Sequence, residues 1–446
     1  MKNEFAKKDK YILFFAFIFI LVPAFQNTGI NAAIMLCGLS VLFLFIQVVI
    51  KREVAIFKTS FSSLDWFMTA LAGIGLIDAG LFILGTHSDS MRGFWVLAIS
   101  AMYFSMRSEW ELTKECMQVI FFAGVILIIL SLLHFLMNTD IILKIGMRDI
   151  GLIEEAALFI GLIGVYNFSL ETNKIMNRLY AIGIVGCMVC LSLCGNDIAL
   201  LLFVLGICLL IVNAERERVQ LRKLLFCFFL SLFIPCNIVL LVNYTSFIHV
   251  EVSVWSLQAS VVGELLLSII AVFVCDYWDK IEEKQEDAMK NMQVFFKMVF
   301  RYIGFFGLLL LVIGVAEIRI GVENILKLFH DSGWTPEGVF ISTFLEISAR
   351  MGENIVTACN ENALWLVYDA YGMIGVLFFV VLFVIFANRL WEVSKCTRKK
   401  DVLTWMLSVG ILVGYVLLPM RPIMIPIDTF ILMKTVHGNA VKKNER

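Results

Sequence analysis

Residues that could bind an anion or transfer a proton gather in one polar interval late in the chain, from Glu317 to Glu361. Over Ile318–His330 the apolar residues recur at helical spacing, and Arg319 and His330 share the opposite face. Two interpretations are open. One is a surface helix joined by ion pairs between successive turns. The other is an amphipathic helix that lies on a membrane and presents Arg319 and His330 to a lipid headgroup.

Two further positions have the chemistry to bind a phosphate. Glu361 and Asn362 open a long apolar run, and the free amide groups at the start of a helix attract anions. Asn is also a frequent N-cap residue with no further role. Arg148 precedes another apolar run. Its side chain either extends to the membrane interface or holds a phosphate, for which a planar guanidinium is suited.

These residues are carried by a chain with the composition of an integral membrane protein. Of its 446 residues 60% are hydrophobic and 16% are charged, and the mean hydropathy is +0.90. Soluble domains carry about 25% charged residues. Because about 20 apolar residues cross a bilayer as a helix, the sequence predicts an all-α polytopic bundle in a single domain, residues 1–446, with 12–14 transmembrane helices. The candidate spans are 11–26, 30–50, 64–85, 93–106, 116–138, 152–170, 179–194, 197–213, 224–243, 254–275, 297–316, 362–388, 402–419 and 422–433.

The distribution of lysine and arginine predicts the orientation of these spans. With a cytoplasmic N-terminus and all candidates crossing, 29 of these residues fall on the cytoplasmic side and seven fall outside. We therefore expect both termini in the cytoplasm and residues 317–361 as one large extracytoplasmic loop. The charged start of the chain leads into span 11–26 without a convincing cleavage site, which favours a retained first helix over a signal peptide.

Other classes of chemistry find less support in the sequence. Acids inside apolar spans are costly and therefore functional candidates. Asp78, Glu264 and Asp197 are such acids; a transporter would use them for coupling, and another protein could keep them protonated or hydrogen-bonded. The eleven cysteines lie mostly in apolar runs, where packing explains them. No zinc-protease, serine-hydrolase or Walker motif is present, so a hydrolytic metalloenzyme or an ATPase is not expected. A net charge of −1 does not suggest a nucleic-acid partner.

Three short motifs and the layout resemble the bacterial superfamily of O-antigen ligases and O-antigen polymerases. Members have about twelve or more helices and one large outward loop between late spans. Asn362, Gly372 and Gly375 match the family pattern at the loop exit, although Glu361 stands where the family often has His. Arg319 resembles an Arg that opens a helix at the loop entrance. Arg148, followed by Gly151, resembles an earlier outward Arg motif.

The resemblance implies a metal-independent glycosyltransferase without a cofactor, which joins undecaprenyl-diphosphate-linked glycan units on the outer face of the bacterial cytoplasmic membrane. Arg148 and Arg319 would bind the diphosphate, with Arg350 as a third cation. Glu361 would be the catalytic base, with His330 as its rival. The partners implied are the lipid-linked oligosaccharide and the bilayer, and the resemblance also allows for a flippase and chain-length regulator proteins.

Two alternatives to a polysaccharide polymerase are open. A ligase would transfer the glycan to a lipid or cell-wall anchor instead of to another repeat unit. A secondary transporter or lipid-linked glycan flippase would use the buried acids Asp78 and Glu264, and it would show broken helices at mid-membrane. The acidity of the loop, with seven acids and three bases between Glu317 and Glu361, means that any anion would be bound locally by individual arginines.

Overall fold

A computed structural model describes residues 31–50, 63–85, 92–106, 114–137, 153–194, 196–214, 218–244, 285–320, 362–396 and 402–418. It also describes residues 21, 348–349, 351–353, 428 and 431–432. These ranges are helical apart from short connections, and none of them contains a β-strand. The predicted all-α fold is therefore confirmed.

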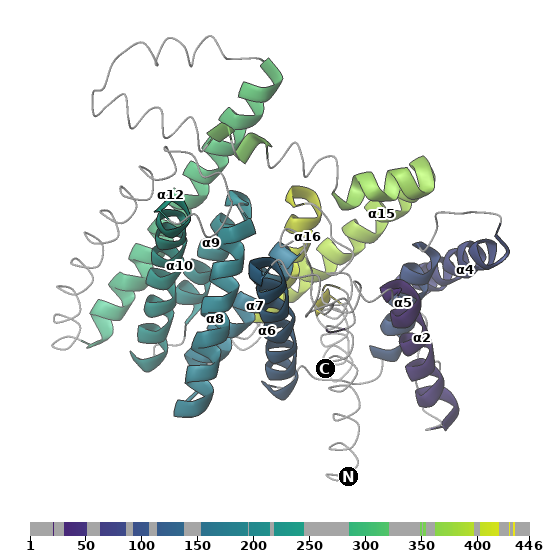
Figure 1. Cartoon of the computed structure of the whole chain (residues 1–446), viewed down its shortest axis with the longest axis horizontal. Helices are drawn as coiled ribbons and strands as arrows, with labels where there is room; N and C mark the ends of the chain where they lie inside the picture. The colour runs from purple at the N-terminus through teal and green to yellow at the C-terminus, as the bar shows by residue number, and fades with distance from the viewer. Residues whose placement is uncertain are drawn as a thin grey trace. The chain divides into compact units, whose positions relative to one another are not determined.

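The described helices follow the predicted spans closely (Figure 1). Five of them contain a segment long and apolar enough to cross a membrane, and four shorter helices are also apolar. The chain is a multi-pass membrane protein, as predicted. Span 254–275, and most of spans 11–26 and 422–433, lie outside the described residues. The helices are α2 (Ala32–Phe45), continued by the π-helix η2 (Ile46–Ile50), α4 (Ser63–Ile83), α5 (Arg92–Met106), α6 (Lys114–Met137), α7 (Glu154–Leu170), α8 (Lys174–Cys194), α9 (Asp197–Asn213), α10 (Arg218–Tyr244), α12 (Gln285–Ile320), α15 (Ala363–Cys396) and α16 (Val402–Leu417).

Asparagine side chains set the start of two of these helices. The Asn31 side chain accepts two backbone N–H bonds from the first turn of α2, at 3.1 and 3.3 Å. Asn196 does the same for α9, at 3.0 and 3.2 Å. Such a cap satisfies amide groups that have no partner within the helix and is worth about 1 kcal/mol. The apolar runs therefore begin as helices at defined residues.

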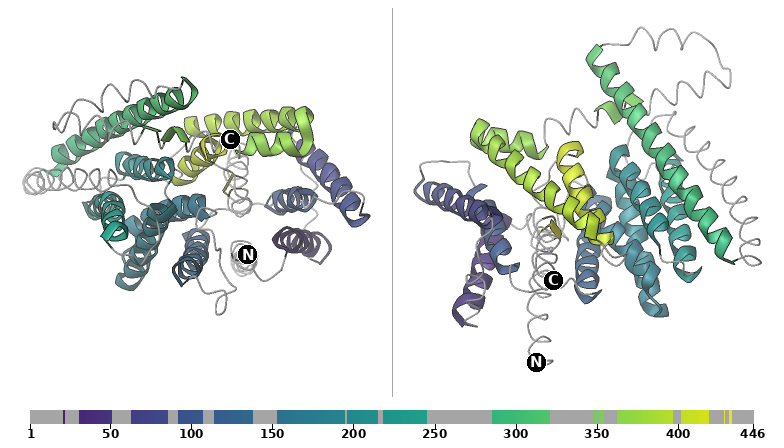
Figure 2. Two further views of the ribbon diagram at one scale, coloured as in Figure 1. Left: turned by 45° about the horizontal axis from the view of Figure 1, so that its top comes forward. Right: turned by 180° about the vertical axis from the view of Figure 1, so that it is seen from behind.

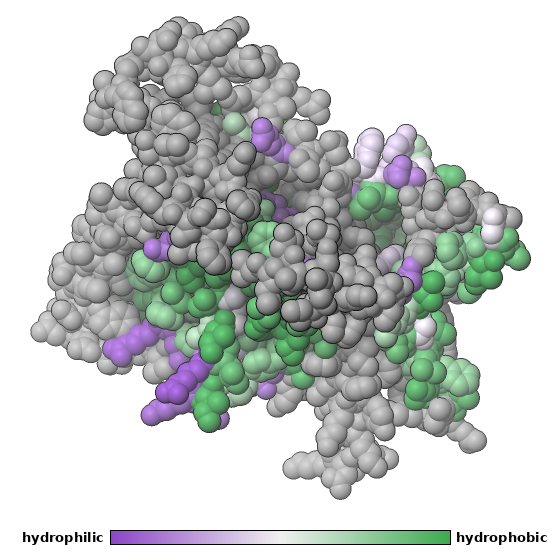
Figure 3. Space-filling view, viewed as in Figure 1, coloured by the Kyte–Doolittle hydropathy of each residue, from purple (hydrophilic) through white to green (hydrophobic). Residues whose placement is uncertain are grey.

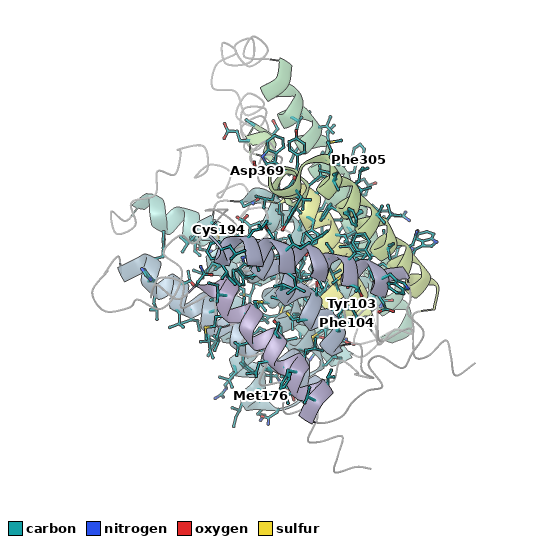
Figure 4. The ribbon with its side chains drawn as sticks, turned by 90° about the vertical axis from the view of Figure 1, so that its right-hand side faces the viewer. Tyr103, Phe104, Met176, Cys194, Phe305 and Asp369 are labelled. Atoms are coloured by element: carbon teal, nitrogen blue, oxygen red, sulfur yellow. The ribbon has the colours of Figure 1, made fainter. Side chains whose placement is uncertain are left out.

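The chain divides into two compact units, each described here by itself. The first unit comprises residues 1–156, 363–416 and 420–446. In it α2 and α4 both pack against α5. Gly93 permits the contact between α4 and α5, because a Cβ at this position would lie 2.5 Å from the backbone nitrogen of Ala79. At the other end of the same helix pair, the hydroxyl of Tyr103, labelled in Figure 4, donates a buried 2.7 Å hydrogen bond to Asp65.

The second unit comprises residues 157–362 and 417–419. Here α10 packs against α8 and α9, and α9 packs against α12. Gly161 of α7 lies where three helices meet: a Cβ there would be 2.7 Å from the ring of Phe203 and 3.2 Å from Cys187. Figure 3 shows apolar side chains over much of the described surface, with hydrophilic ones at several places on the same face. Small residues therefore allow close helix packing, which is how helices associate in a membrane.

Lys223 stabilises the connection between α7 and α8. Its ammonium group donates hydrogen bonds to the carbonyl oxygen of Phe168 at 3.0 Å, to that of Glu171, and to the side chain of Asn177 at 3.1 Å. These carbonyls lie at the C-terminal end of α7, where a cation also interacts favourably with the helix dipole. Desolvation lowers the pKa of Lys223 from its ordinary value, and the Glu171 carboxylate partly offsets this.

Side-chain hydrogen bonds join helix ends within each unit. The bond from Tyr103 to Asp65 joins α5 to α4 in the first unit. In the second unit Lys223 of α10 donates to the end of α7, and the side chain of Gln293 in α12 donates to the carbonyl of Ala214 at 3.1 Å. The alternation of the spans across the membrane, and the side that faces outward, remain predictions.

The helix α12 corrects one prediction about the loop 317–361. It runs without interruption from Gln285 to Ile320, where the described residues stop, so Arg319 lies within it and does not open a separate helix. The physical reason is that Ile318 and Ile320 continue the apolar run of α12, and neither Gly nor Pro lies between Gly314 and Ile320. The rest of the predicted amphipathic helix, from Gly321 to His330, lies outside the described residues.

Candidate functional site

Most of the predicted site residues fall outside the part of the chain that the structure describes. This holds for Arg148, His330, Arg350, Glu361 and the intramembrane acid Glu264. Of Arg319 only the backbone is described, and the same is true of Asp197, the first residue of α9. Asn362 directly precedes α15 and is 9% exposed, in keeping with its predicted place at a helix start. The roles assigned to these residues remain predictions, and the described parts of the site are α15, which begins after Asn362, and α12, which carries Arg319.

The helix that begins after Asn362 is broken at Gly372. The backbone there has φ 63° and ψ −158°, whereas the residues before and after Gly372 are helical. This conformation is one that essentially only glycine adopts, because a Cβ would clash with the backbone. The predicted single span 362–388 is therefore wrong as a continuous helix. It consists of a short arm (residues 363–371) and a long arm (residues 373–396).

The two arms double back on each other, and Gly375 allows them to touch (Figures 1 and 2). A Cβ at Gly375 would lie 2.5 Å from the Cβ of Tyr371 and 3.2 Å from the carbonyl oxygen of Val367. Eight residues of straight helix would separate Val367 and Gly375 by about 12 Å. Gly372 thus makes the turn and Gly375 provides the close approach, so the two glycines of the family-like motif have different backbone tasks.

The broken helix packs against α4 within the first unit. The Tyr371 hydroxyl donates a 3.3 Å hydrogen bond to the carboxylate of Asp78, and the rings of Phe67 and Phe378 lie 5.2 Å apart. Asp78 was a functional candidate because of its place inside an apolar span. Its partner lies 293 positions away in sequence, so no local pattern could have identified it. The acid is therefore joined to the helix break.

The short arm presents a polar and aromatic face away from the long arm. Trp365 and Tyr368 are 48% and 45% exposed, and their rings lie 5.6 Å apart. Asp369, labelled in Figure 4, is exposed beside them. Val367 and Tyr371, which face the long arm, are only partly exposed. On a helix, positions 365, 368 and 369 lie together and opposite to 363, 367 and 371.

A second close contact joins the flanks of Arg350 to α12. A Cβ at Gly314 of α12 would overlap the carbonyl oxygen of Ser348, and one at Gly352 would overlap the backbone of Gly314. Gly314 precedes Arg319 by five residues, which is about 7.5 Å along a helix. The chain on either side of Arg350 is thereby held against the helix that carries Arg319. Sequence analysis missed this contact, for which the paired glycines were the only signal.

Buried acids form a further cluster within the first unit that sequence analysis did not select. Asp428 is fully buried beside Tyr415, and Glu155 lies within electrostatic range of the same tyrosine. No donor among the described residues reaches either carboxylate oxygen of Asp428 with hydrogen-bond geometry. The described residues contain no group of three or more side chains arranged to hold a metal ion. In the sequence, the only indication of this cluster was the place of Asp428 within the predicted span 422–433.

Comparisons of the chain with protein-family models, with curated protein sequences and with solved structures give no match.

Proposed function

We propose that this protein is a polysaccharide polymerase-like glycosyltransferase that joins undecaprenyl-diphosphate-linked glycan units on the outer face of the bacterial cytoplasmic membrane. The observation that carries the proposal is the register Asn362–Gly372–Gly375, which resembles the loop exit of the O-antigen ligase and polymerase superfamily. In the structure both glycines have a backbone task that another residue would disturb. A motif whose residues have separate physical roles is stronger support than a match of letters.

The proposed reaction has two chemical requirements. A hydroxyl of the acceptor attacks the anomeric carbon of the donor sugar, and the bond from that carbon to the diphosphate oxygen breaks. Glu361 takes the proton from the hydroxyl, with His330 as the rival base. The diphosphate leaves with the bonding electron pair and is stabilised by the guanidinium groups of Arg148 and Arg319, with Arg350 as a third cation.

The contact around Gly314 supports the grouping of two of these arginines. The segments that flank Arg350 touch α12 five residues before Arg319. Two cations carried by elements in contact can act on one diphosphate, which needs several hydrogen bonds as its charge develops. The acidic composition of the loop makes such a local pair more necessary, since the loop as a whole does not attract anions.

A second candidate function is supported by a specific observation. Transporters commonly place a broken helix and a buried ionisable residue together near the middle of the membrane. The break at Gly372 adjoins the hydrogen bond between Tyr371 and the half-buried Asp78, which supports this comparison. A lipid-linked glycan flippase therefore remains the alternative, and so does a ligase of the same family.

A cellular experiment separates these functions. Arg148→Ala and Arg319→Ala are each expressed in a host from which the native gene for this protein has been deleted. Lys174→Ala, at an exposed lysine of α8, is the control. We expect both arginine variants to reach the membrane but to leave single repeat units on the outer surface, accessible to an added glycosidase. Lys174→Ala should give normal polymer. Normal polymer in both arginine variants contradicts the proposal. Repeat units that accumulate on the inner face of cells without the protein favour the flippase, and loss of anchored glycan with polymer retained favours the ligase.

A further inference from the structure

The short arm of α15 carries a surface whose composition fits neither lipid nor bulk water alone. Trp365 and Tyr368 together form one aromatic surface, because their ring centroids lie 5.6 Å apart with a 37° tilt between the planes. Both side chains are close to half exposed, and Asp369 adds a carboxylate on the same face. The opposite side of the arm is fixed by contact with the long arm at Gly375. The surface is therefore held on a rigid support.

An interfacial aromatic belt is the competing explanation for this surface. Trp and Tyr gather where a membrane meets water, with the ring in the apolar layer and the polar tip outside it. A carboxylate within the same face is costly against lipid, by about 2.5–3.5 kcal/mol at the centre of a bilayer and less toward the interface. The neighbouring exposed residues Leu364 and Leu366 lie on the two flanks of the arm rather than on this face. The face with Asp369 is thus the one suited to water.

Two aromatic rings beside a carboxylate, on a face suited to water, are complementary to a sugar, whose ring carries many hydroxyl groups. Ligand sites combine aromatic surface with a few polar groups that fix orientation. A sugar offers C–H groups that pack on an aromatic ring and hydroxyl groups that donate to a carboxylate. A nucleotide or a lipid phosphate would be repelled by Asp369, and no basic residue occurs in the short arm from 363 to 371.

We propose that Trp365, Tyr368 and Asp369 form a binding subsite for the sugar residues of the glycan. This inference rests on the proposed function, since it names where that substrate would be held. The aromatic pair packs against the sugar ring faces, and the Asp369 carboxylate accepts hydrogen bonds from their hydroxyls. Gly372 and Gly375 position the subsite by folding the short arm back on the long arm.

The test uses the full chain in lipid nanodiscs and two readouts. The first is saturation-transfer NMR with the free repeat-unit oligosaccharide, released by mild acid from the lipid-linked pool of the expressing cells. The second is the rate of polymer formation against the concentration of the lipid-linked repeat unit. The variants are Trp365→Ala, Tyr368→Ala and Asp369→Asn. Trp391→Ala is the matched control, because Trp391 is a 65% exposed tryptophan in the long arm of the same helix.

We expect wild-type protein and Trp391→Ala to bind the oligosaccharide alike, and the other three variants to bind it more weakly. Loss of one aromatic contact should raise KM for the repeat unit by about two- to tenfold with little change in kcat. Binding by Trp365→Ala and Tyr368→Ala equal to that of Trp391→Ala overturns the subsite, and so does an absence of binding by the wild type. If the wild type binds the oligosaccharide and Trp365→Ala and Tyr368→Ala bind it more weakly, but no polymer forms, the proposed function is contradicted while the subsite is supported.

A fluorescence measurement separates the subsite from a membrane belt. The contribution of Trp365 is the difference between the fluorescence of wild-type protein and that of Trp365→Ala. We expect the free oligosaccharide to change this contribution and spin-labelled lipid in the nanodisc to leave it unquenched. Quenching of the Trp365 contribution by the lipid, without any response to the oligosaccharide, indicates a membrane belt and overturns the subsite.

Discussion

Substitution of Gly372 by alanine tests the hairpin in α15. The residue has open space around the position of a Cβ, so packing does not forbid a side chain. Its backbone at φ 63° and ψ −158° does, because that region is essentially restricted to glycine and costs other residues about 1–3 kcal/mol. We therefore expect Gly372→Ala to lower the free energy of unfolding by about that amount.

Gly73→Ala is the matched control for this substitution. Gly73 lies in α4, also with nothing within 4 Å of a Cβ, and its backbone is not in the positive-φ region. Alanine is the better helix former, by up to about 1 kcal/mol, so this variant should be as stable as wild type or slightly more so. The two variants add the same methyl group, and their difference isolates the backbone conformation at Gly372.

The strain in Gly372→Ala can also be relieved by straightening the helix. In that case α15 would become one continuous helix of 34 residues. It would be about 51 Å long, which is well beyond the roughly 30 Å thickness of the hydrocarbon core. Spin labels at Leu364 and Leu377, which are both exposed, report the geometry in a background without native cysteines. Thirteen residues of straight helix separate them by about 20 Å, whereas packed arms lie about 8–10 Å apart between axes.

The measurements are unfolding by sodium dodecyl sulfate in a mild detergent and dipolar broadening in the EPR spectrum. We expect wild type and Gly73→Ala to show strong broadening. Gly372→Ala should show either reduced stability with broadening retained, or broadening lost. A variant that matches Gly73→Ala in both measurements would refute the argument that Gly372 is required for the turn.

Three contacts in the structure give the remaining predictions. Gly314→Ala should destabilise the protein by about 1–3 kcal/mol in the same unfolding assay, because its Cβ would overlap a backbone oxygen, while Gly304→Ala, with no neighbour within 4 Å, should not. Equal stability of the two would contradict the contact. Lys223→Met should cost about 1.5–3 kcal/mol by leaving helix carbonyls without a charged donor. Desolvation lowers the pKa of Lys223 in the folded protein, so the unfolded chain holds that proton more tightly. The free energy of unfolding of the wild type should therefore rise as the pH increases from the folded pKa toward the ordinary lysine value. The Met variant should lack that rise. Tyr371→Phe removes the hydrogen bond to Asp78 and should cost about 0.5–1.5 kcal/mol, so that unchanged stability argues against the pairing.

The bounds of a helix could be predicted where a capping residue lies directly at the end of an apolar run. The predicted span 197–213 has the same bounds as α9, because Asn196 caps its start and Asn213 ends the apolar run. The predicted spans 224–243 and 297–316 were shorter than α10 and α12, because charged residues that end an apolar run do not end a helix outside the membrane.

The details of the site depended on features that hydropathy does not record. Gly372 and Gly375 were noted for their spacing, but glycine is frequent in membrane helices and its backbone angles cannot be read from composition. Arg319 was predicted to open a helix and instead lies within α12, because the apolar pattern continues past the predicted span. Asp78 was selected as an acid within an apolar span and is half-buried, whereas its pairing with Tyr371 depends on how distant helices pack.

The most direct test of the central claim is glycosyl transfer by the purified protein alone. The full chain in proteoliposomes is given its lipid-linked repeat unit as the only substrate, with a chelator present and no nucleotide sugar. We predict that longer lipid-linked glycans form and undecaprenyl diphosphate is released, and that Arg319→Ala and Arg148→Ala abolish both products while Lys174→Ala does not. Active protein with both arginine variants unaffected, or a well-folded wild type that forms no product and instead moves the repeat unit across the bilayer, would contradict the account.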